Sequence, residues 1–334
     1  MKSNIDHIKK ITGAIDINDQ QQVLLNNIPT GNYTGDEYAA KPSGKMLFDK
    51  LQQIIYSKFY IQPCKPLSDQ APTQAGLEKN ISILSKANKT VEQFDEGWTV
   101  EKNDESVSLL AKKGNKLIRL KAGEYLNIPK GNNADEPAGV RIYRPKEYSS
   151  VTDVFYYGYG SAIDENGESE MVRFYFNSTF EGNRKWMQLL TGFANEFAVP
   201  FIFKCLVHPF YYGRCDTAVL YCDKQYAGFV YDFIDSVYAA VKKDMRSSTP
   251  LFTYPLKKEI GFAEQPPNET ESFGSHWSKI IAAGMMKAFE ADAAKEKWFD
   301  AVMEHITVNH RYPDPEKLYR NPGSRYPYYF INEK

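Results

Sequence analysis

The chain has 334 residues, with 41 basic and 42 acidic side chains and a formal net charge of -1. This length allows one large domain or two modest ones, and the balanced charge argues against nucleic-acid or membrane binding through a basic surface. Its four cysteines form no CxxC pair and its few histidines show no HExxH spacing, so we expect reduced thiols, a cytoplasmic location and no metal site. The N-terminus lacks the apolar core of a signal peptide, and no apolar run approaches the length of a membrane span.

In the N-terminal part, the hydrophobic pattern changes from helical to strand-like spacing. Residues 1–44 are polar and predict a loosely ordered segment with at most a short helix near 5–15. Apolar residues recur at helical intervals over 45–59, and a weaker helical pattern follows at 76–89. From Gly97 the period becomes two, which predicts short strands at 98–100, 106–112, 116–121 and 140–143.

The central stretch predicts strands that surround one amphipathic helix. The strands fall at 154–159, 171–177, 199–207 and 217–222, and the helix falls at 182–197. In the strand at 171–177, Arg173, Tyr175 and Asn177 share one face and the apolar residues between them share the other.

The C-terminal part is mostly helical. Its predicted elements are helices at 226–244, 272–289 and 297–308, with a short strand at 251–256. The fold expected from all these elements is α+β, with a central, mostly antiparallel sheet and helices interleaved and at both ends. We expect a polar segment at 1–44, a single domain at 45–310 and a Tyr- and Pro-rich surface tail at 311–334.

Charged side chains stand inside or beside these apolar strands. Lys204 is the single cation of the strand at 199–207, and Arg214 and Asp216 come just before the strand at 217–222. Such charges are costly to desolvate and therefore need a reason. One reason is a buried structural ion pair, and the other is a polar site for an anionic ligand.

Common catalytic motifs are missing from the sequence. No dinucleotide-binding glycine motif, phosphate-binding loop, serine-hydrolase elbow or kinase motif occurs, so nucleotide-dependent and serine-hydrolase chemistry have no support. What remains is a set of basic, acidic and aromatic candidates: Arg141, Arg144, Arg173, Lys204, Arg214, Asp216, Tyr221, Glu264, Glu271 and His276.

Several blocks of the sequence resemble the HopA effector family. They are RFYFN (173–177), VPFIFKCL (199–206), YYGRCDTAVLY (211–221), GFAEQPP (261–267) and ESFGSHWSKIIAAG (271–284), in the family's order, with a weaker match at GVRIYRP (139–145). The resemblance covers about residues 45–290. It departs from the family after ESFG, where His276 stands in place of an expected arginine.

The resemblance implies one of two functions, neither of which implies a cofactor. Members in class V lanthipeptide and thioamitide biosynthesis are lyases that work with a separate phosphotransferase-like kinase. The kinase phosphorylates Ser or Thr of a precursor peptide, and the HopA-like partner eliminates phosphate to leave dehydroalanine or dehydrobutyrine. Effector members are virulence proteins that bind a chaperone, are injected by a dedicated secretion system and act on host proteins.

For the lyase, β-elimination needs a base for the Cα proton and cations for the departing phosphate. We expect Lys204 to be the base, because burial beside arginines lowers the pKa of an amine. Asp216 would orient Arg214 or Lys204, and Tyr221 or His276 would protonate the leaving phosphate.

The predicted phosphate- and substrate-binding residues are basic or polar. Arginine suits phosphate because its planar guanidinium makes two charge-assisted hydrogen bonds. The predicted set is Arg173, Arg214, Arg141, Arg144, Asn177, Glu264 and Glu271. The structural alternatives are an incidental ion pair (Arg214 with Asp216), an ammonium that snorkels out of the sheet (Lys204), an exposed side chain (His276), a helix-dipole charge (Glu271) and a loop support (Glu264).

Overall fold

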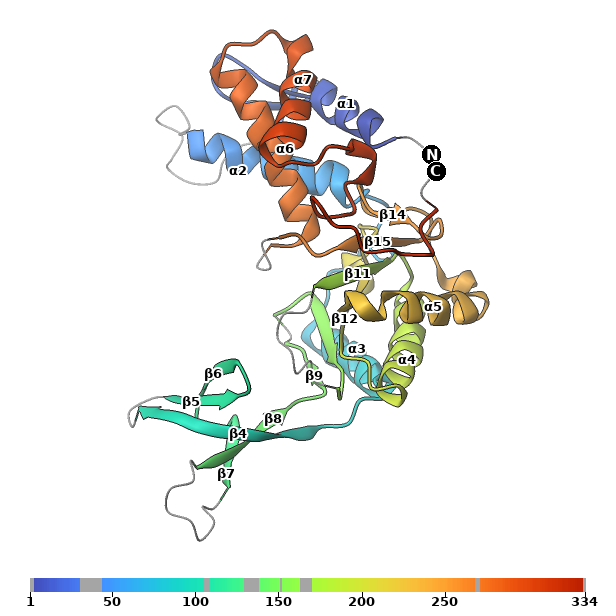
Figure 1. The fold of residues 1–334 in the computed structure, drawn as a ribbon. Helices are drawn as coiled ribbons and strands as arrows, with labels where there is room; N and C mark the ends of the chain where they lie inside the picture. The colour runs from blue at the N-terminus through green and yellow to red at the C-terminus, as the bar shows by residue number, and fades with distance from the viewer. Residues whose placement is uncertain are drawn as a thin grey trace.

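The computed structural model describes residues 3–30, 44–104, 108–128, 138–150, 152–162, 170–267 and 271–332. A seven-stranded antiparallel sheet lies at the centre, helices surround it, and a separate five-stranded sheet projects to one side (Figure 1). The predicted α+β fold with an antiparallel central sheet is therefore confirmed. No helix in these ranges is both long enough and apolar enough to cross a membrane.

The N-terminal residues form a helix and a small sheet. Helix α1 (Asn4–Ala14) begins at a capping box in which Ser3 and Asp6 satisfy each other's backbone N–H groups. Strands β1 (Ile15–Ile17), β2 (Val23–Leu25) and β3 (Ile28–Pro29) follow as an antiparallel sheet. The segment expected to be loosely ordered thus has regular structure at 4–17, 23–25 and 28–29, and α1 buries Ile8 and Ile11 completely; residues 31–43 lie outside the described ranges.

Two predicted helices lead to the five-stranded sheet. Helix α2 (Gly44–Ile54) continues as a π-helical segment, Ile55–Tyr60, and α3 (Gln74–Ala87) follows. The sheet contains β4 (Gln93–Asp104), β5 (Ser108–Lys113), β6 (Lys116–Leu120), β7 (Tyr125–Ile128) and β8 (Gly139–Arg144), in the order β6-β5-β4-β8-β7. It has a core of its own, built from Trp98, Leu109, Ala111, Leu120, Val140 and Ile142.

The central sheet has the order β14-β15-β11-β13-β12-β10-β9. Its strands are β9 (Glu147–Tyr148), β10 (Phe155–Tyr159), β11 (Met171–Phe176), β12 (Phe201–Leu206), β13 (Ala218–Asp223), β14 (Tyr254–Pro255) and β15 (Ile260–Glu264). The strand expected at 251–256 is reduced to β14, and the sequence predicts no strand where β15 lies. Every residue of β15 is buried, so its sequence lacks the alternation that marks a half-buried strand.

The two faces of the central sheet differ. On one face, Phe176 and Phe203 pack under helix α4 (Phe180–Glu196), and the ring centre of its Trp186 lies 4.7 Å from that of Phe176. Helices α3 and α5 (Ala227–Val241) contact α4. The other face carries the charged and hydroxyl-bearing side chains, as the alternation in β11 predicts.

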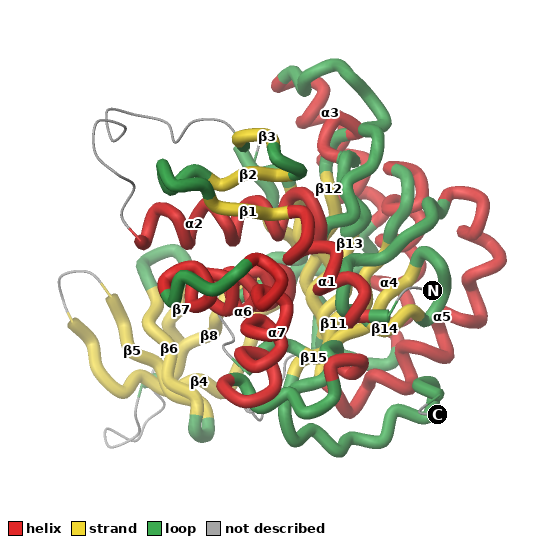
Figure 2. The backbone as a smooth tube through the Cα atoms, turned by 90° about the horizontal axis from the view of Figure 1, so that it is seen from above, coloured by secondary structure: helices red, strands yellow, loops and turns green. Residues whose placement is uncertain are grey.

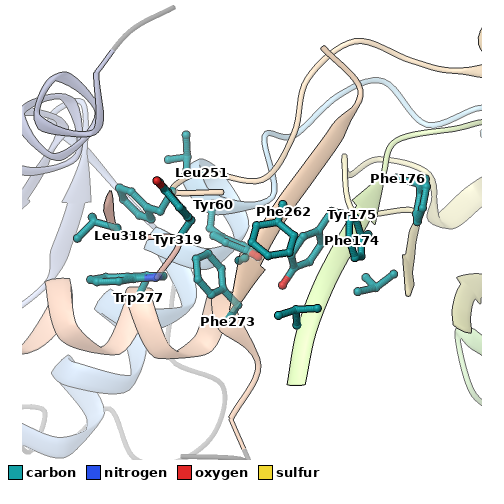
Figure 3. Packing of buried hydrophobic residues seen from close by; sticks show 14 of the residues in the cluster. Tyr60, Phe174, Tyr175, Phe176, Leu251, Phe262, Phe273, Trp277, Leu318 and Tyr319 are labelled. Atoms are coloured by element: carbon teal, nitrogen blue, oxygen red, sulfur yellow. The ribbon is translucent and has the colours of Figure 1, made fainter. Parts of the chain in front are cut away.

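The remaining helices gather beyond β15. Helices α6 (Phe273–Glu290) and α7 (Trp298–Glu304) pack together, and α1 and α2 pack against them (Figure 2). A π-helical segment, His305–Asn309, extends α7. The residues after it were expected to lie on the surface, but Leu318 and Tyr319 are buried among the side chains between α6 and the sheet (Figure 3). The boundaries 1–44, 45–310 and 311–334 remain a prediction.

Candidate functional site

The polar face of the central sheet brings together side chains from three neighbouring strands. Arg173 on β11 pairs in register with Tyr221 on β13, and Tyr221 pairs with Ile202 on β12. Because side chains alternate along a strand, Lys204 lies on this same face, two residues beyond Ile202. Three strands that the sequence predicted separately therefore place their polar residues on one surface.

Two aromatic rings connect three cations on this surface. The Lys204 Nζ atom lies 4.9 Å from the centre of the Phe155 ring and 5.5 Å from that of Tyr221. The Arg173 Cζ atom lies 5.1 Å from the Tyr221 ring, and the Arg214 Cζ atom lies 5.8 Å from the Phe155 ring. We call Arg173, Lys204 and Arg214 the cationic cluster. Its members meet over shared aromatic faces, which attract cations.

The charge of Arg214 is balanced within the site. Its guanidinium binds both carboxylate oxygens of Asp216, with 2.6 Å between Nη2 and Oδ2, and Nη2 also donates to the Tyr56 hydroxyl at 2.8 Å. Burial disfavours the charged form, but Asp216 and Tyr56 outweigh it and raise the pKa of Arg214 above its ordinary value. The pair expected from the sequence is thus present and largely buried, with a third partner from the π-helical segment.

The charge of Arg173 is not balanced in this way. Its side chain is buried, and Nε donates to the side-chain oxygen of Gln265 at 2.7 Å while Nη2 donates to the Glu271 carbonyl at 3.1 Å. Both acceptors are neutral, and no carboxylate among the described residues forms an ion pair with Arg173. Burial disfavours its charge, yet the hydroxyls of Tyr175 and Tyr221 leave its pKa raised. Arg173 therefore supplies an uncompensated positive charge.

The side-chain amine of Lys204 has no hydrogen bond and no ion pair with any residue in the described ranges. Burial lowers the pKa of its amine, and the nearby charge of Arg173 lowers it further, while Tyr157, Asp216 and Tyr175 oppose the shift. A larger fraction of this amine is neutral at a given pH than in an ordinary lysine. It can therefore accept a proton beside a bound anion.

The start of α6 supports the site from the side of β11. Ser272 caps the helix, and Phe273 packs against both Tyr60 and Tyr175, each with ring centres 6.3 Å apart (Figure 3). Gly274 is required because a Cβ atom there would lie 2.7 Å from Cε2 of Tyr56 and even closer to the Tyr60 ring. The ESFG block therefore packs closely against Tyr56, whose hydroxyl accepts a hydrogen bond from Arg214.

Arg141 and Arg144, predicted as a third phosphate ligand, lie elsewhere. Both are on β8 in the five-stranded sheet, where Arg141 pairs with Glu96 at 3.1 Å and Arg144 pairs with Asp95 at 3.0 Å. Their ion-pair partners also lie on β4 of that sheet, apart from Arg173, Lys204 and Arg214 of the central sheet region. The sequence could not separate them from the cluster, because only the tertiary fold shows that β8 belongs to another sheet.

His276 is also separate from the cluster. Its Nε2 lies 3.2 Å from the Tyr312 hydroxyl and its Nδ1 lies 3.6 Å from the Glu271 carboxylate, which also binds Lys279. Burial lowers the pKa of His276 to about 4, and Glu271 opposes this shift only in part. A neutral imidazole at this place has no described contact with Lys204, Arg173 or Arg214. Glu271 reaches the cluster only through its backbone carbonyl.

Two other predicted residues hold the chain around the site. The buried Asn177 donates to the carbonyls of Ser247 and Ser248, each at 3.1 Å. The buried Glu264 accepts hydrogen bonds from the backbone N–H of Asn321 at 2.7 Å and from the Tyr328 hydroxyl at 2.9 Å. Both side chains connect segments that are distant in the sequence. For Glu264 this agrees with the structural alternative, in which it supports a loop.

The structure adds contact residues that the sequence did not indicate: Tyr56, Phe155, Tyr157 and Gln265. Gln265 lies in the AEQPP block beside the predicted Glu264, so its motif was a usable signal. The aromatic residues carried no such signal, because their patterns are equally typical of core helices and strands.

A cavity of about 610 Å³ lies away from the cationic cluster. It is bordered by the start of α1, the 247–255 loop and Tyr319, and no cluster residue lines it. Within the described ranges, no group of three or more His, Cys, Asp or Glu side chains is placed to hold a metal ion. The uncompensated charge of the cluster, rather than this cavity, is suited to an anion.

Comparison with known proteins finds two kinds of similarity. A model of the HopA1 effector protein family matches residues 147–320. A solved structure of the effector protein from Pseudomonas syringae pv. tomato strain DC3000 is similar, with 14% identity and a TM-score of 0.43 over 84% of this chain and 91% of that chain. A solved structure of the effector protein from Pseudomonas syringae pv. syringae strain 61 is similar as well, with 14% identity and a TM-score of 0.41 over 83% of this chain and 98% of that chain. No curated protein matches the chain.

Proposed function

The chain belongs to the HopA1 effector protein family, and on this premise we propose that it eliminates phosphate from phosphoserine or phosphothreonine residues of a peptide. The observation that carries the proposal is the uncompensated charge of buried Arg173 beside Lys204, an amine without a hydrogen-bond or ion-pair partner in the described ranges. A phosphate dianion supplies the missing negative charge, and the guanidinium groups bind it with charge-assisted hydrogen bonds.

In the proposed reaction, Lys204 acts as the general base. Its neutral amine takes the Cα proton of the phosphorylated residue, the electron pair forms the Cα=Cβ bond, and the Cβ–O bond to phosphate breaks. Arg173 and Arg214 bind the phosphate as negative charge grows on the departing oxygen. The products are a dehydroalanine or dehydrobutyrine residue and inorganic phosphate. A positioned base of this kind typically contributes about a hundred- to ten-thousand-fold to the rate.

Tyr221 is the proposed proton donor to the leaving oxygen. Its ring lies between Arg173 and Lys204, and burial raises the pKa of its hydroxyl, with Arg173 opposing the shift. The hydroxyl therefore keeps its proton until a stronger base forms beside it, as the departing phosphate oxygen does. Asp216 acts through Arg214, which it holds in place.

The corresponding biological setting is the maturation of a ribosomal, lanthipeptide-type precursor in the cytoplasm. A separate phosphotransferase-like kinase would supply the phosphorylated peptide, since the chain itself has no motif for nucleotide binding. The kinase and the precursor are then the partners of this protein.

The test is mass spectrometry of a Ser/Thr-phosphorylated peptide after incubation with the protein. We expect loss of phosphoric acid to leave a residue that adds an external thiol. Arg173→Met should abolish this loss, whereas Arg184→Met, which removes an arginine paired with Glu181 on α4, should not. An authentic phosphorylated precursor that stays unchanged, alone and with its kinase, would reject the lyase.

The second candidate function is a non-catalytic effector that binds a phosphorylated host protein through the same cluster. The effectors for which the family is named favour it. Such a protein would bind a chaperone and leave the cell by a dedicated secretion system. A chaperone gene beside this one supports the effector, and a kinase-like gene beside a short precursor gene supports the lyase.

A further inference from the structure

An aromatic surface adjoins the cationic cluster on the same face of the central sheet. Tyr148 on β9 pairs in register with Tyr157 on β10, and their ring centres lie 6.2 Å apart. The Phe155 ring, on the same strand as Tyr157, lies 6.4 Å from the Tyr157 ring. We call Tyr148, Tyr157 and Phe155 the aromatic lane. It runs from the edge of the sheet towards Lys204.

This lane is open to solvent, whereas the opposite face of the same strands is closed. Tyr148 is 51% exposed, and neighbouring Ile202 on β12 is 36% exposed, while Tyr156 and Phe203 on the opposite face are fully buried. A solvated face of an antiparallel sheet is normally polar. Adjacent exposed apolar side chains more often mark a binding surface.

The lane and the cluster are continuous. Tyr157 pairs in register with Lys204, and the Lys204 Nζ atom lies 4.9 Å from the Phe155 ring. A residue whose Cα lies over the Lys204 amine, with its phosphate directed to Arg173, would therefore have its neighbours over β10 and β9. Adjacent strands lie about 4.8 Å apart and an extended peptide rises about 3.3 Å per residue, so Tyr157 and Tyr148, which lie one and two strands from Lys204, are about one to three residues from the phosphorylated residue.

We propose that the aromatic lane binds a large apolar side chain located two residues from the phosphorylated residue. This inference rests on the proposed function and specifies its substrate class: an extended phosphopeptide with Phe, Tyr, Leu or a similar residue at that spacing. Side chains of an extended peptide alternate, so residues two apart face the same way and can both contact the sheet. Stacking on Tyr148 and Tyr157 then selects the flanking residue.

Binding is measured with a labelled peptide whose phosphothreonine is replaced by its phosphonate analogue, in which a CH₂ group stands for the ester oxygen and prevents elimination. One version carries Phe two residues before and two residues after the phosphonate, and the other carries Ala at both places. Fluorescence anisotropy gives Kd for each version. Wild-type protein should bind the Phe peptide about tenfold more tightly, as expected for one well-stacked aromatic contact.

The variants assign that preference to the lane. Tyr148→Ala and Tyr157→Leu should each reduce the Phe-over-Ala preference to less than about threefold. Tyr329→Ala, which removes a tyrosine that is 63% exposed at the far end of the chain, should retain it. Circular dichroism at matched temperature shows that each variant is folded. A wild-type protein without the preference, or folded lane variants that keep it, would overturn the proposal.

Phosphate release from the corresponding phosphothreonine peptides separates this inference from the lyase reaction. Release without any Phe preference would overturn the lane and leave the lyase standing. A Phe preference that depends on Tyr148, in a protein that releases no phosphate, would support the lane as a binding surface and reject the lyase.

Discussion

The guanidinium of Arg173 lies against the amide of Gln265 and not against a carboxylate: Nε donates to Oε1 at 2.7 Å, and Nη2 reaches the same oxygen. A glutamate would fit the same space and would pair with the arginine more strongly. A glutamine orients Arg173 and leaves its charge available to an anion. The charge of the site thus depends on which of two nearly isosteric side chains stands at position 265.

Gln265→Glu should keep the fold and remove anion binding. The new carboxylate would form an ion pair with Arg173 and neutralise its charge. The phosphonate would then no longer meet an unpaired cation, so we expect Kd for the phosphonate peptide to rise at least about tenfold. Gln70→Glu, which adds the same charge at an exposed position, is the control. Unchanged affinity in Gln265→Glu would mean that Arg173 does not bind the phosphate.

Lys204→Arg should separate binding from chemistry. Arginine keeps the positive charge but does not give up its proton at any working pH, so it cannot be the base. We expect phosphate release to fall about a hundred- to ten-thousand-fold while the phosphonate peptide still binds within a few-fold of wild type. The two readouts are single-turnover phosphate release and anisotropy. A full rate in this variant would exclude Lys204 as the base.

The pH dependence of phosphate release should report the Lys204 amine. Burial holds its pKa below the ordinary value of 10.5, so log kcat/KM should rise with pH and level off below pH 10.5. Measuring kcat/KM for one phosphopeptide from neutral to alkaline pH gives the midpoint of this titration directly. A profile that is flat over this range, or that still rises at pH 10.5, would contradict this assignment.

The same shift predicts how stability changes with pH. The unfolded chain holds the Lys204 proton more tightly than the folded chain, so the folded state is disfavoured below the folded pKa and gains stability as pH rises towards 10.5. Lys204→Met removes the buried amine, so its free energy of unfolding should exceed that of wild type at neutral pH, and this difference should shrink at alkaline pH. Thermal unfolding of both proteins across this pH range measures it, and a Lys204→Met protein that is less stable at neutral pH would contradict it.

Gly274→Ala should destabilise the protein by about 1–3 kcal/mol, as overpacking of a core does. The added Cβ would displace the rings of Tyr60 and Tyr56, and Tyr56 would then lose its contact with Arg214. Gly13→Ala, in a helix with no atom within 4 Å of the new Cβ, should be neutral or stabilising. Thermal denaturation compares the two; equal melting temperatures would show that the start of α6 can shift without cost.

Glu264→Gln should loosen the C-terminal segment. The substitution removes the charge that accepts hydrogen bonds from Asn321 and Tyr328, each worth about 1.5–3 kcal/mol for a charged partner. Limited proteolysis should cut this segment faster than in wild type or in the exposed control Glu304→Gln. Equal cleavage rates in all three proteins would show that other contacts hold the segment.

The sequence predicted the parts of the site that depend on strand alternation. The period of two in 171–177 placed Arg173 opposite the core face, and the apolar surroundings of Lys204 marked it as unusual; both meet at the cluster. Arg141 and Arg144 have the same local pattern but belong to another sheet, a fact that only long-range pairing determines. Strand β15 was missed because burial on both faces removes the alternation that marks a strand.

Two neighbouring residues at the end of β15 connect the cluster to the last part of the chain. Glu264 binds Asn321, 57 positions later, and Gln265 binds Arg173, 92 positions earlier. During synthesis, Glu264 therefore lacks its contacts with Asn321 and Tyr328 until residues 321–328 have been made. The end of β15, next to which Gln265 orients Arg173, is consequently fixed late, and a chain interrupted before that point would hold Gln265 beside a strand that lacks its C-terminal anchor.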